Sequence, residues 1–492
     1  MYSQDIFVLA PDNISDGIRA LNYIDLFAGC GGLSLGLEKA GFNLALAVEK
    51  SDMAAETFYH NFISRITDPE VWKAYSHADR TVQEQADEKL VVKELSAVLE
   101  NKSLLKKLKA LNIDLVAGGP PCQGFSLAGR RNPEDLRNQL PWQFLQFVEA
   151  VQPKAVIIEN VSGMSQDFVK HGKSSPFNEL RLALKDTGKG YKVQPLHLNA
   201  KHFGAPQNRP RVMLVGVRTD ISKRLQLNVS DDTWKSEFDH VQNKKFLERP
   251  SLAPEATHFD TNILNVRDAI WDLSSKGYNR KNDISAFALE MRTDTDWMPL
   301  HIKAEEQRPK LANHNLRQHA SHIEKRFEIY QYLRDSNIHP KVFAIPKNEN
   351  LTEDGQKNLI RAALKNAKFP AKAPNGNVIA KTENSLVKMI MQLATKKHSQ
   401  RPLDWTLPSP TVVSLPDDYV HPHEPRTLTV RELARFQSFP DAFEFRSKET
   451  TGSLRRRYEV PQYTQVGNAV PPKLALAIGN LVHSLLLRDK NL

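Results

Sequence analysis

Residues 23–48 read YIDLFAGCGGLSLGLEKAGFNLALAV, and this stretch decides the fold of the N-terminal part of the chain. The apolar run 23–27 predicts a strand, residues 33–40 have helical spacing, and residues 44–48 predict a second strand. A glycine-rich turn, AGCGG, joins the first strand to the helix. Strand, turn, helix and strand in this order are typical of a parallel sheet covered by helices on both faces.

The same alternation continues to about residue 218. Apolar runs at 114–117, 155–158 and 212–217 predict three further strands. Residues 64–110 interrupt the pattern with a charged, helix-prone insertion, which we interpret as surface helices without an assigned function. We therefore predict an α/β fold built on a doubly wound, mostly parallel sheet.

The remainder of the chain divides into two parts. Alternation is lost from 219 to 400, where a helical pattern near 321–333 is the clearest element. Regular patterning returns at 401 and ends in an apolar helix that follows Pro471 and Pro472. We predict a sheet domain in 1–218 with the insertion 64–110, a large inserted domain in 219–400, and a segment 401–492 that returns to complete the first domain.

Composition narrows the possible partners and compartment. The 492 residues exceed one typical core, and 67 Lys and Arg against 57 Asp and Glu leave a net charge of +10. Residues 301–400 hold 18 of these basic residues against 9 acidic ones, which favours a polyanionic partner. Two cysteines exclude a disulfide framework and favour a reducing compartment. The longest apolar run, LVHSLLL, is too short for a membrane span, so we expect a cytoplasmic protein without a membrane partner.

The segment Asp25–Gly32, DLFAGCGG, has the chemistry of a ligand-binding turn. Glycines let backbone N–H groups approach a polar ligand at the start of a helix. Glu49 ends the next predicted strand, where a carboxylate can bind a ribose diol. The G-x-G-x-x-G spacing of dinucleotide folds is absent, which disfavours hydride transfer. The turn and Glu49 together indicate a cofactor that contains a nucleoside.

The segment Gly118–Ser126, GGPPCQGFS, follows the predicted strand 114–117 directly. It places Cys122 at the carboxyl end of a strand, where α/β folds bind ligands. A buried structural cysteine in a turn is the alternative interpretation. Because Cys122 lies between Pro121 and Gln123 rather than in an apolar run, the context favours a nucleophile.

With four later motifs, these segments make the chain resemble the C5-cytosine DNA methyltransferase family. The later motifs are Glu159–Val161 (ENV), Gln207–Arg211 (QNRPR), Arg431–Pro440 (RELARFQSFP) and Gln465–Pro472 (QVGNAVPP). The resemblance implies the Rossmann-like fold of S-adenosylmethionine-dependent methyltransferases. It also implies a catalytic and cofactor-binding role for 1–218, target recognition for 219–400, and a catalytic-domain role for 401–492.

The activity implied by the resemblance is methylation of C5 of cytosine in a specific double-stranded DNA sequence. Cys122 would attack C6 of the cytosine, and Glu159 would hydrogen-bond N3 and the exocyclic amine. Arg211, with Arg209 beside it, would hold the base O2 and orient the catalytic loop. The target atom is inaccessible within a duplex, so the family flips the base out of the stack.

The resemblance also assigns binding residues. Those for S-adenosylmethionine are Asp25, Phe27, Gly29, Gly31, Gly32, Glu49, Pro120 and Asn468. The resemblance assigns contacts with the opened DNA to Gln123, Ser126 and Thr411. Two departures concern the adenine: Lys50 stands where many members have an apolar or aromatic residue, and Glu94 is the nearest candidate for the acidic residue that reads adenine. Cys30 is interpreted as a small residue in the turn.

We expect double-stranded DNA as partner, association with the nucleoid, and either a separate cognate restriction endonuclease or an independent role. His314, His319 and His322 have no accompanying cysteines, so no metal site is predicted. One alternative, a tRNA cytosine-C5 methyltransferase, is disfavoured by the length of 219–400. The other alternative, a catalytically silent DNA-binding regulator, is disfavoured because Cys122, Glu159 and the glycines are present.

Overall fold

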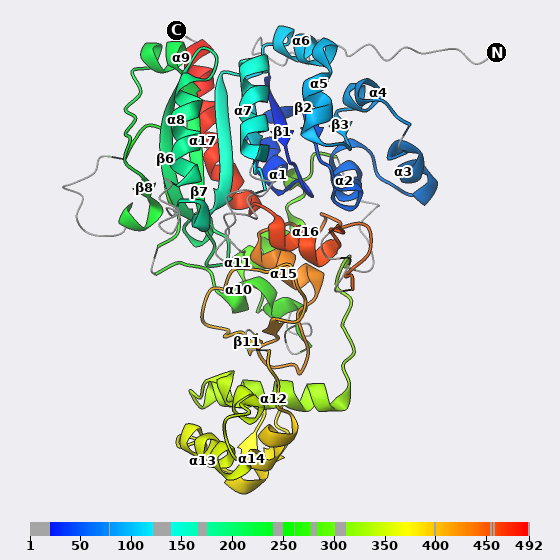
Figure 1. Cartoon of the computed structure of the whole chain (residues 1–492), viewed down its shortest axis with the longest axis vertical. Coiled ribbons are helices and arrows are strands. Elements are labelled where there is room, and N and C mark those ends of the chain that lie inside the picture. The colour runs from blue at the N-terminus through cyan, green and yellow to red at the C-terminus, as the bar shows by residue number, and fades with distance from the viewer. Residues whose placement is uncertain are drawn as a thin grey trace.

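In a computed structural model of the chain, the described residues are 20–77, 79–121, 139–165, 175–239, 249–259, 261–275, 277, 283–300, 311–397, 400–452, 455 and 458–490. The protein is elongated, with a large sheet at one end of its long axis and a small helical lobe at the other (Figure 1).

The sheet has eight strands in the order β3-β2-β1-β4-β5-β7-β6-β8. Their bounds are β1 (Leu21–Leu26), β2 (Phe42–Val48), β3 (Leu90–Val91), β4 (Leu115–Gly118), β5 (Ala155–Val161), β6 (Tyr191–Asn199), β7 (Pro210–Arg218) and β8 (Trp234–Lys235). All neighbouring pairs are parallel except those that β7 makes with β5 and β6. This confirms the predicted doubly wound, mostly parallel sheet.

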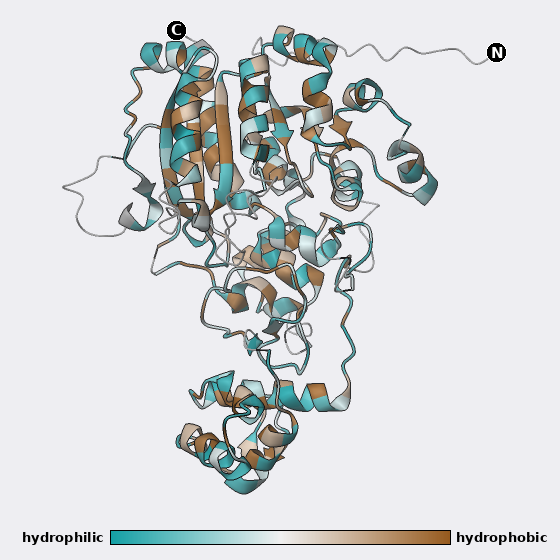
Figure 2. Ribbon diagram, viewed as in Figure 1, coloured by the Kyte–Doolittle hydropathy of each residue, from teal (hydrophilic) through white to brown (hydrophobic). Residues whose placement is uncertain are grey.

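Helices cover both faces of the sheet because successive strand residues point to opposite sides. Tyr23 packs into one core and Ile24 into the other, and both are fully buried. The first core is covered by α1 (Gly32–Lys39) and α17 (Pro472–Lys490), and the second by α5 (Leu95–Glu100), α6 (Lys102–Ala110), α7 (Leu140–Val151) and α8 (Pro176–Asp186). The strands are accordingly hydrophobic along most of their length (Figure 2).

The C-terminal helix packs closely on the first helix. A Cβ atom at Gly36 would lie 2.4 Å from Ala475 Cβ, and one at Gly479 would lie 2.8 Å from Ala40 Cβ. Glycine at both positions therefore lets the backbones of α1 and α17 approach one another. Residues more than 400 positions apart are thereby joined in one core.

The prediction that 64–110 forms only surface helices is wrong, because Trp72 and Tyr75 in its first half are buried in the first core and its second half adds a strand to the sheet. Strand β3 extends the sheet beside β2, while Val91, Val98 and Leu108 are buried in the second core. Lysines occupy the outer side of α6, and charged residues precede and end α5, so the apolar spacing of the two helices is hard to see in the sequence. The first half contains α3 (Pro69–Tyr75) and α4 (Val82–Asp87).

Strand β6 was also not predicted. Its sequence, YKVQPLHLN, mixes polar residues and a proline with apolar ones, so it lacks the continuous apolar run of the other strands. Pairing along its whole length with the buried strand β7 defines it as a strand.

The region after β8 divides between two cores. Short helices α10 (Val266–Ile270), α11 (Ala286–Thr293), α15 (Val430–Phe436) and α16 (Gln462–Asn468) share the core of α1 and α17. The lobe has its own core, formed by α12 (Ser321–Asp335), the 3₁₀ helix Pro340–Lys347, α13 (Glu353–Ala363) and α14 (Glu383–Gln392). The predicted helix near 321–333 is α12. The boundaries 219 and 400 stay a prediction.

Smaller elements complete the fold. They are α2 (Asp52–Phe58), α9 (Thr219–Arg224), the hairpin β9 (Ala371–Lys372) and β10 (Val378–Ala380), and the pair β11 (Arg401–Pro402) and β12 (Tyr419–Val420). Among the described helices, none alone is long and apolar enough to cross a membrane, although the bent pair Gln462–Asn468 and Pro472–Asp489 passes that test by length and composition.

Candidate active site

The sequence-predicted groups meet at one edge of the sheet. Glu49 follows β2, the glycine turn follows β1, Gly119 and Pro120 follow β4, and Glu159 lies near the end of β5. These four strands are parallel neighbours, so their carboxyl ends share an edge. Adjacent strands lie about 4.8 Å apart, which places all four groups along one continuous cradle.

The turn after β1 has an unusual backbone. Phe27 has a φ of 61°, a value that non-glycine residues seldom adopt, and Gly29 has a φ of 57°. The N–H of Gly29 donates to Glu49 Oε2 at 2.8 Å, while Glu49 Oε1 accepts from the N–H of Ser51 at 2.7 Å. Burial raises the pKa of Glu49. The turn therefore fixes the carboxylate that the sequence assigns to a ribose.

The three glycines of the turn have different surroundings. A Cβ atom at Gly29 would meet nothing within 4 Å, whereas one at Gly31 would lie 2.4 Å from the ring of Phe62. At Gly32 the added atom would lie 2.3 Å from the carbonyl oxygen of Val470. Only Gly29 borders open space, and the other two glycines permit close packing of the protein itself.

Asp25 lies beneath the turn and is fully buried. Its Oδ2 accepts a 2.6 Å hydrogen bond from Ser34 Oγ, and its Oδ1 has no hydrogen-bond partner among the described residues. Burial raises the pKa of Asp25 to about 7. An orphaned carboxylate oxygen beside an open glycine turn fits a ligand that carries positive charge or N–H donors, as S-adenosylmethionine does.

Lys50 and Glu94 form an ion pair at the ends of β2 and β3. Lys50 Nζ lies 2.7 Å from Glu94 Oε1, and both side chains are mostly exposed. In the sequence, Lys50 is a departure from the family pattern, and Glu94 is the candidate for the acidic residue that reads adenine. The structure brings them together on the side of Glu49 that faces away from β4 and β5.

Cys122, Gln123 and Ser126 lie outside the described residues. The chain leading to them is described: the carbonyl oxygen of Pro120 accepts a 2.9 Å hydrogen bond from Asn160 Nδ2. Asn160 thus ties the end of β4 to the end of β5, immediately before the predicted nucleophile.

Glu159 and Arg211 form a buried ion pair. Arg211 Nε lies 2.8 Å from Glu159 Oε1, and the two residues occupy the paired strands β5 and β7. A Cβ atom at Gly119 would lie 2.9 Å from Glu159 Oε2, so the carboxylate reaches the backbone just before Cys122. The pair fixes the orientation of a carboxylate beside the nucleophile segment.

Arg209 forms its hydrogen bonds with backbone carbonyls rather than with Glu159. Its guanidinium donates to the carbonyl oxygens of Val412 at 3.1 Å, Gly467 at 2.7 Å and Ala469 at 3.0 Å. Burial lowers the pKa of Arg209 well below its usual value. Because Gly467 and Ala469 flank Asn468, this arginine holds the segment that carries a predicted cofactor residue. Arg209 therefore connects the start of β7 to two segments that lie more than 200 positions further along the chain.

Asn468 itself is exposed, as expected for a residue that meets a ligand. Thr411 lies beside the same segments, and its Oγ1 donates to the carbonyl oxygen of Asn208 at 2.8 Å. Both residues therefore border the site, although they lie more than 190 positions from β7.

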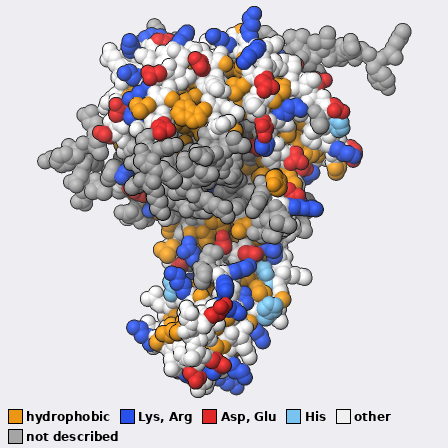
Figure 3. Space-filling view, viewed as in Figure 1, with side chains coloured by type: hydrophobic (Ala, Val, Ile, Leu, Met, Phe, Trp, Pro, Cys, Tyr) orange, Lys and Arg blue, Asp and Glu red, His pale blue; other side chains and the backbone are white. Residues whose placement is uncertain are grey.

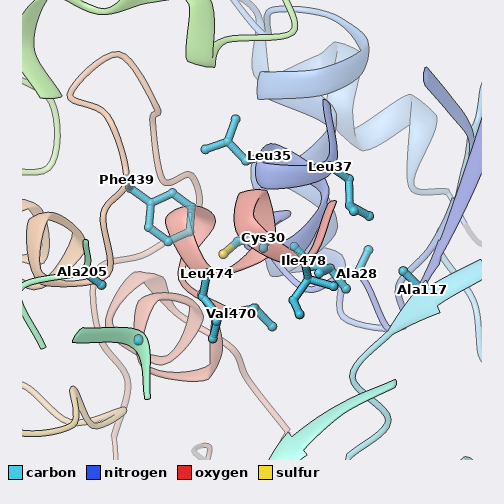
Figure 4. Packing of buried hydrophobic residues seen from close by; sticks show 14 of the residues in the cluster. Ala28, Cys30, Leu35, Leu37, Ala117, Ala205, Phe439, Val470, Leu474 and Ile478 are labelled. Atoms are coloured by element: carbon cyan, nitrogen blue, oxygen red, sulfur yellow. The ribbon is translucent and has the colours of Figure 1, made fainter. Parts of the chain in front are cut away.

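Cys30 is buried among Phe439, Val470 and Leu474 (Figure 4). Burial raises the pKa of its thiol to about 12, so it remains protonated at neutral pH. This agrees with the interpretation of Cys30 as a small packing residue.

Among the described residues, His314, His319 and His322 do not belong to a group of potential metal ligands. His314 Nδ1 lies 2.9 Å from Thr429 Oγ1, and His319 Nε2 lies 3.3 Å from the backbone N–H of Thr427. Another group, His421, His423 and Glu424, has suitable atoms within 4.8 Å of one another. However, His421 Nδ1 accepts the N–H of Glu424, and Glu424 is bound by Ser275 and Arg426. We assign no metal to it.

Several residues of the site were not assigned a role from the sequence. Asn160 and Ser34 position Pro120 and Asp25, and Gln465 joins α16 to α2 by accepting from Thr57 Oγ1 and donating to the Met53 carbonyl. A polar residue inside an otherwise apolar strand or helix was the available signal for Asn160 and Ser34.

Comparison with known proteins agrees with this geometry. The family model for C-5 cytosine-specific DNA methylase matches residues 21–483. The type II methyltransferase M.DdeI of Desulfomicrobium norvegicum is 28% identical over 475 residues, covering 94% of this chain and 88% of the relative. M.AgeI of Thalassovita gelatinovora is 29% identical over 489 residues, covering 93% and 98%. A solved structure described as a DNA modification methyltransferase encoded within a prophage (E. coli) shares the fold, with a TM-score of 0.56, 23% identity, and coverage of 95% of this chain and 100% of that one.

Proposed function

The chain belongs to the C-5 cytosine-specific DNA methylase family, and from that premise we propose how its residues divide the work of the reaction. Membership makes it an S-adenosylmethionine-dependent DNA (cytosine-5-)-methyltransferase that acts on double-stranded DNA. The observation that supports the assignment of roles is the buried Glu159–Arg211 pair beside the segment that leads to Cys122.

We propose that Cys122 is the nucleophile. Its thiolate adds to C6 of the target cytosine, and C5 then gains the electron density needed to take up a methyl group. A base then removes the C5 proton, and the electrons of the C5–H bond expel the Cys122 thiolate from C6, which restores the aromatic ring. Cys30 cannot replace Cys122, because its buried thiol stays protonated.

Glu159 would bind N3 and the exocyclic amine of the cytosine. The carboxyl group accepts a hydrogen bond from the exocyclic amine, and in its protonated form it donates to N3, where negative charge develops as the thiolate adds to C6. Arg211 keeps the carboxylate in place and is the better candidate of the two arginines for the base O2. We assign Arg209 the part of a positioning residue, because its N–H groups bind the carbonyls on either side of Asn468.

When bound, S-adenosylmethionine supplies the methyl group. Glu49 would hold the ribose hydroxyls, Asp25 would face the cationic part of the methionine, and Gly29 would leave room for it. Phe27, Pro120 and Asn468 would close the remaining sides, while Gly31 and Gly32 shape the turn. Glu94, which follows β3 and pairs with Lys50, would contact the adenine.

The target cytosine would leave the duplex to reach Cys122, with Gln123, Ser126 and Thr411 as contacts to the opened DNA. Residues 219–400 would recognise the target sequence, and 401–492 would complete the catalytic domain. We further propose a restriction–modification setting with a separate cognate endonuclease, supported by similarity to type II methyltransferases, and a cytoplasmic location on the nucleoid.

Bisulfite sequencing of DNA from a methylation-free host that expresses the protein tests this proposal. We expect protected cytosines in one recurring short motif, and none in a host that expresses Cys122→Ala. Duplex DNA with 5-fluorocytosine in that motif should trap the wild-type protein covalently, because fluorine at C5 does not leave as a proton does. If a folded, cofactor-binding protein protects no DNA, tRNA becomes the substrate to examine. Methylation by Cys122→Ala would remove Cys122 as the nucleophile.

A further inference from the structure

The lobe is a separate unit of structure within the proposed recognition region. Its core contains Phe327, Leu333, Ile360 and Leu386, and it is distinct from the two cores beside the sheet. Figure 1 places α13 and α14 at the end of the long axis farthest from the sheet, with α12 between them and the rest of the protein. A surface so placed lies far from the edge of the sheet that holds the active site.

The lobe is held in a defined orientation. Gln331 on α12 is fully buried, and its Nε2 donates to the carbonyl oxygens of His421 and Glu424, both at 2.8 Å. Arg334 also donates to the carbonyl oxygen of Leu403. These contacts tie α12 to the segment that returns to the catalytic domain, so a ligand on the lobe has a fixed position relative to the site.

Helix α13 exposes most of its surface. Only Ile360 is buried within it, and this residue faces Leu386 and Ile390 in the core of the lobe. Asn358, Arg361 and Lys365 lie on one exposed side of the chain at helical spacing, and α14 contributes Asn384 and Lys388 next to them. We call these five residues the amide face.

Arg361 is the centre of the amide face. Its Nη1 donates to Asn358 Oδ1 and its Nη2 to Asn384 Oδ1, each at 3.3 Å. The two amide oxygens orient the guanidinium without neutralising it. The carboxylates of α13 lie about two turns from Arg361, where Glu353 and Asp354 pair with Lys357. On α14, Glu383 precedes Asn384 in the sequence.

The charge of the amide face suits a polyanion. In the part of the lobe that the structure describes, Lys365 and Lys388 are exposed and form no ion pair. Arginine, lysine and amide side chains are the groups that bind phosphate and sugar oxygens of nucleic acid. Figure 3 shows Lys and Arg side chains, together with some Asp and Glu side chains, on the visible side of the lobe.

We propose that the amide face binds the DNA backbone outside the target sequence, and so lengthens the stretch of duplex held by the enzyme. This inference rests on the proposed DNA methyltransferase function. Because the amide face lies at the far end of the lobe, its contacts add affinity on long duplexes without selecting the base to be methylated.

The test compares duplexes of about 12 and about 36 base pairs centred on the methylated motif, since one turn of duplex spans about 34 Å. The full-length protein is used with S-adenosylhomocysteine. We expect wild type to bind the long duplex more tightly than the short one. The variant Arg361→Ala/Lys365→Ala/Lys388→Ala should bind the long duplex roughly 10- to 100-fold more weakly than wild type does, and so lose that preference. Its log–log salt slope on long DNA should fall by up to about 2.7. Lys365→Glu alone should act in the same direction.

The matched control is Lys102→Ala/Lys106→Ala/Lys109→Ala on α6, which removes three exposed cations near the sheet. It should leave both affinities unchanged. A loss of affinity that is equal on short and long duplexes, or a changed methylation motif, would show that the amide face contacts the target sequence instead. Unchanged binding would remove the amide face as a DNA contact. Absence of methylation by the wild-type protein would instead count against the proposed function.

Discussion

Replacing Arg209 by methionine tests whether this buried arginine holds the cofactor-binding segment together. The change removes the donors that serve the carbonyls of Val412, Gly467 and Ala469. Ala469 retains a donor in Gln437 Nε2 at 3.4 Å, so two carbonyls lose their donor. Each buried acceptor left unsatisfied costs about 1–3 kcal/mol, which is partly offset because a buried charge is also removed.

We expect a loss of about 2–4 kcal/mol in the free energy of unfolding. Urea unfolding followed by circular dichroism measures this loss. Because Gly467 and Ala469 flank Asn468, the affinity for S-adenosylhomocysteine should also fall by about tenfold, equivalent to about 1.4 kcal/mol. Isothermal titration calorimetry in the absence of DNA measures that affinity. Arg209→Lys should lie between the two proteins, since one ammonium cannot serve three carbonyls.

Arg218→Met is the matched control, at the far end of strand β7, which begins directly after Arg209. Arg218 pairs with the half-exposed Asp220 at 2.7 Å, and such a pair near the surface contributes at most about 1 kcal/mol. The control should bind cofactor like wild type. If Arg209→Met keeps both the urea midpoint and the cofactor affinity of wild type, the guanidinium does not hold the segment in the way proposed.

Four further substitutions separate effects on binding and catalysis from effects on stability. Gly32→Ala should destabilise the protein by about 1–3 kcal/mol in urea unfolding, because the new methyl group meets a backbone oxygen at 2.3 Å. Gly29→Ala should mainly weaken cofactor binding, measured by calorimetry. If Gly29→Ala and Gly32→Ala changed the unfolding free energy and the cofactor affinity equally, the two glycines would not differ in packing as described. Burial raises the pKa of Asp25 to about 7 in the folded protein, above its unfolded value of about 4. Ionised Asp25 therefore destabilises the folded protein increasingly as the pH rises from about 4 to about 7. Asp25→Asn should accordingly be stabilised relative to wild type by more at pH 8 than at pH 5. A pH-independent difference would refute the burial argument. Asn160→Ala should lower kcat through loss of its hydrogen bond to Pro120, while calorimetry shows unchanged cofactor affinity.

Much of the fold follows from local pattern. The apolar runs at β1, β2, β4, β5 and β7 are continuous because these strands are buried on both faces, so periodicity alone could identify them. Strand β3 could not be identified in this way, since two residues show no period, and β6 carries too many polar residues. The helices α5 and α6 were taken for surface elements because their charged sides dominate the sequence.

The site residues that belong to short sequence motifs could be proposed from the sequence alone. The glycine turn, Glu49, Glu159 and Arg211 come from compact motifs, and each lies at the shared edge of the sheet. The relation of Arg209 to Asn468 was not predictable, because residues about 260 positions apart meet only through folding. The same holds for Lys50 and Glu94, whose ion pair depends on β3 lying beside β2.

The sequence by itself determined the class of fold and the family, and it predicts the reactive groups, because these depend on local periodicity and on residue types at short spacing. Only the tertiary structure decided which glycine borders open space, which arginine pairs with the carboxylate, and which cations of the lobe form no ion pair among the described residues. Those properties depend on the direction of side chains and on distances between segments, and both are set by the packing of the whole chain.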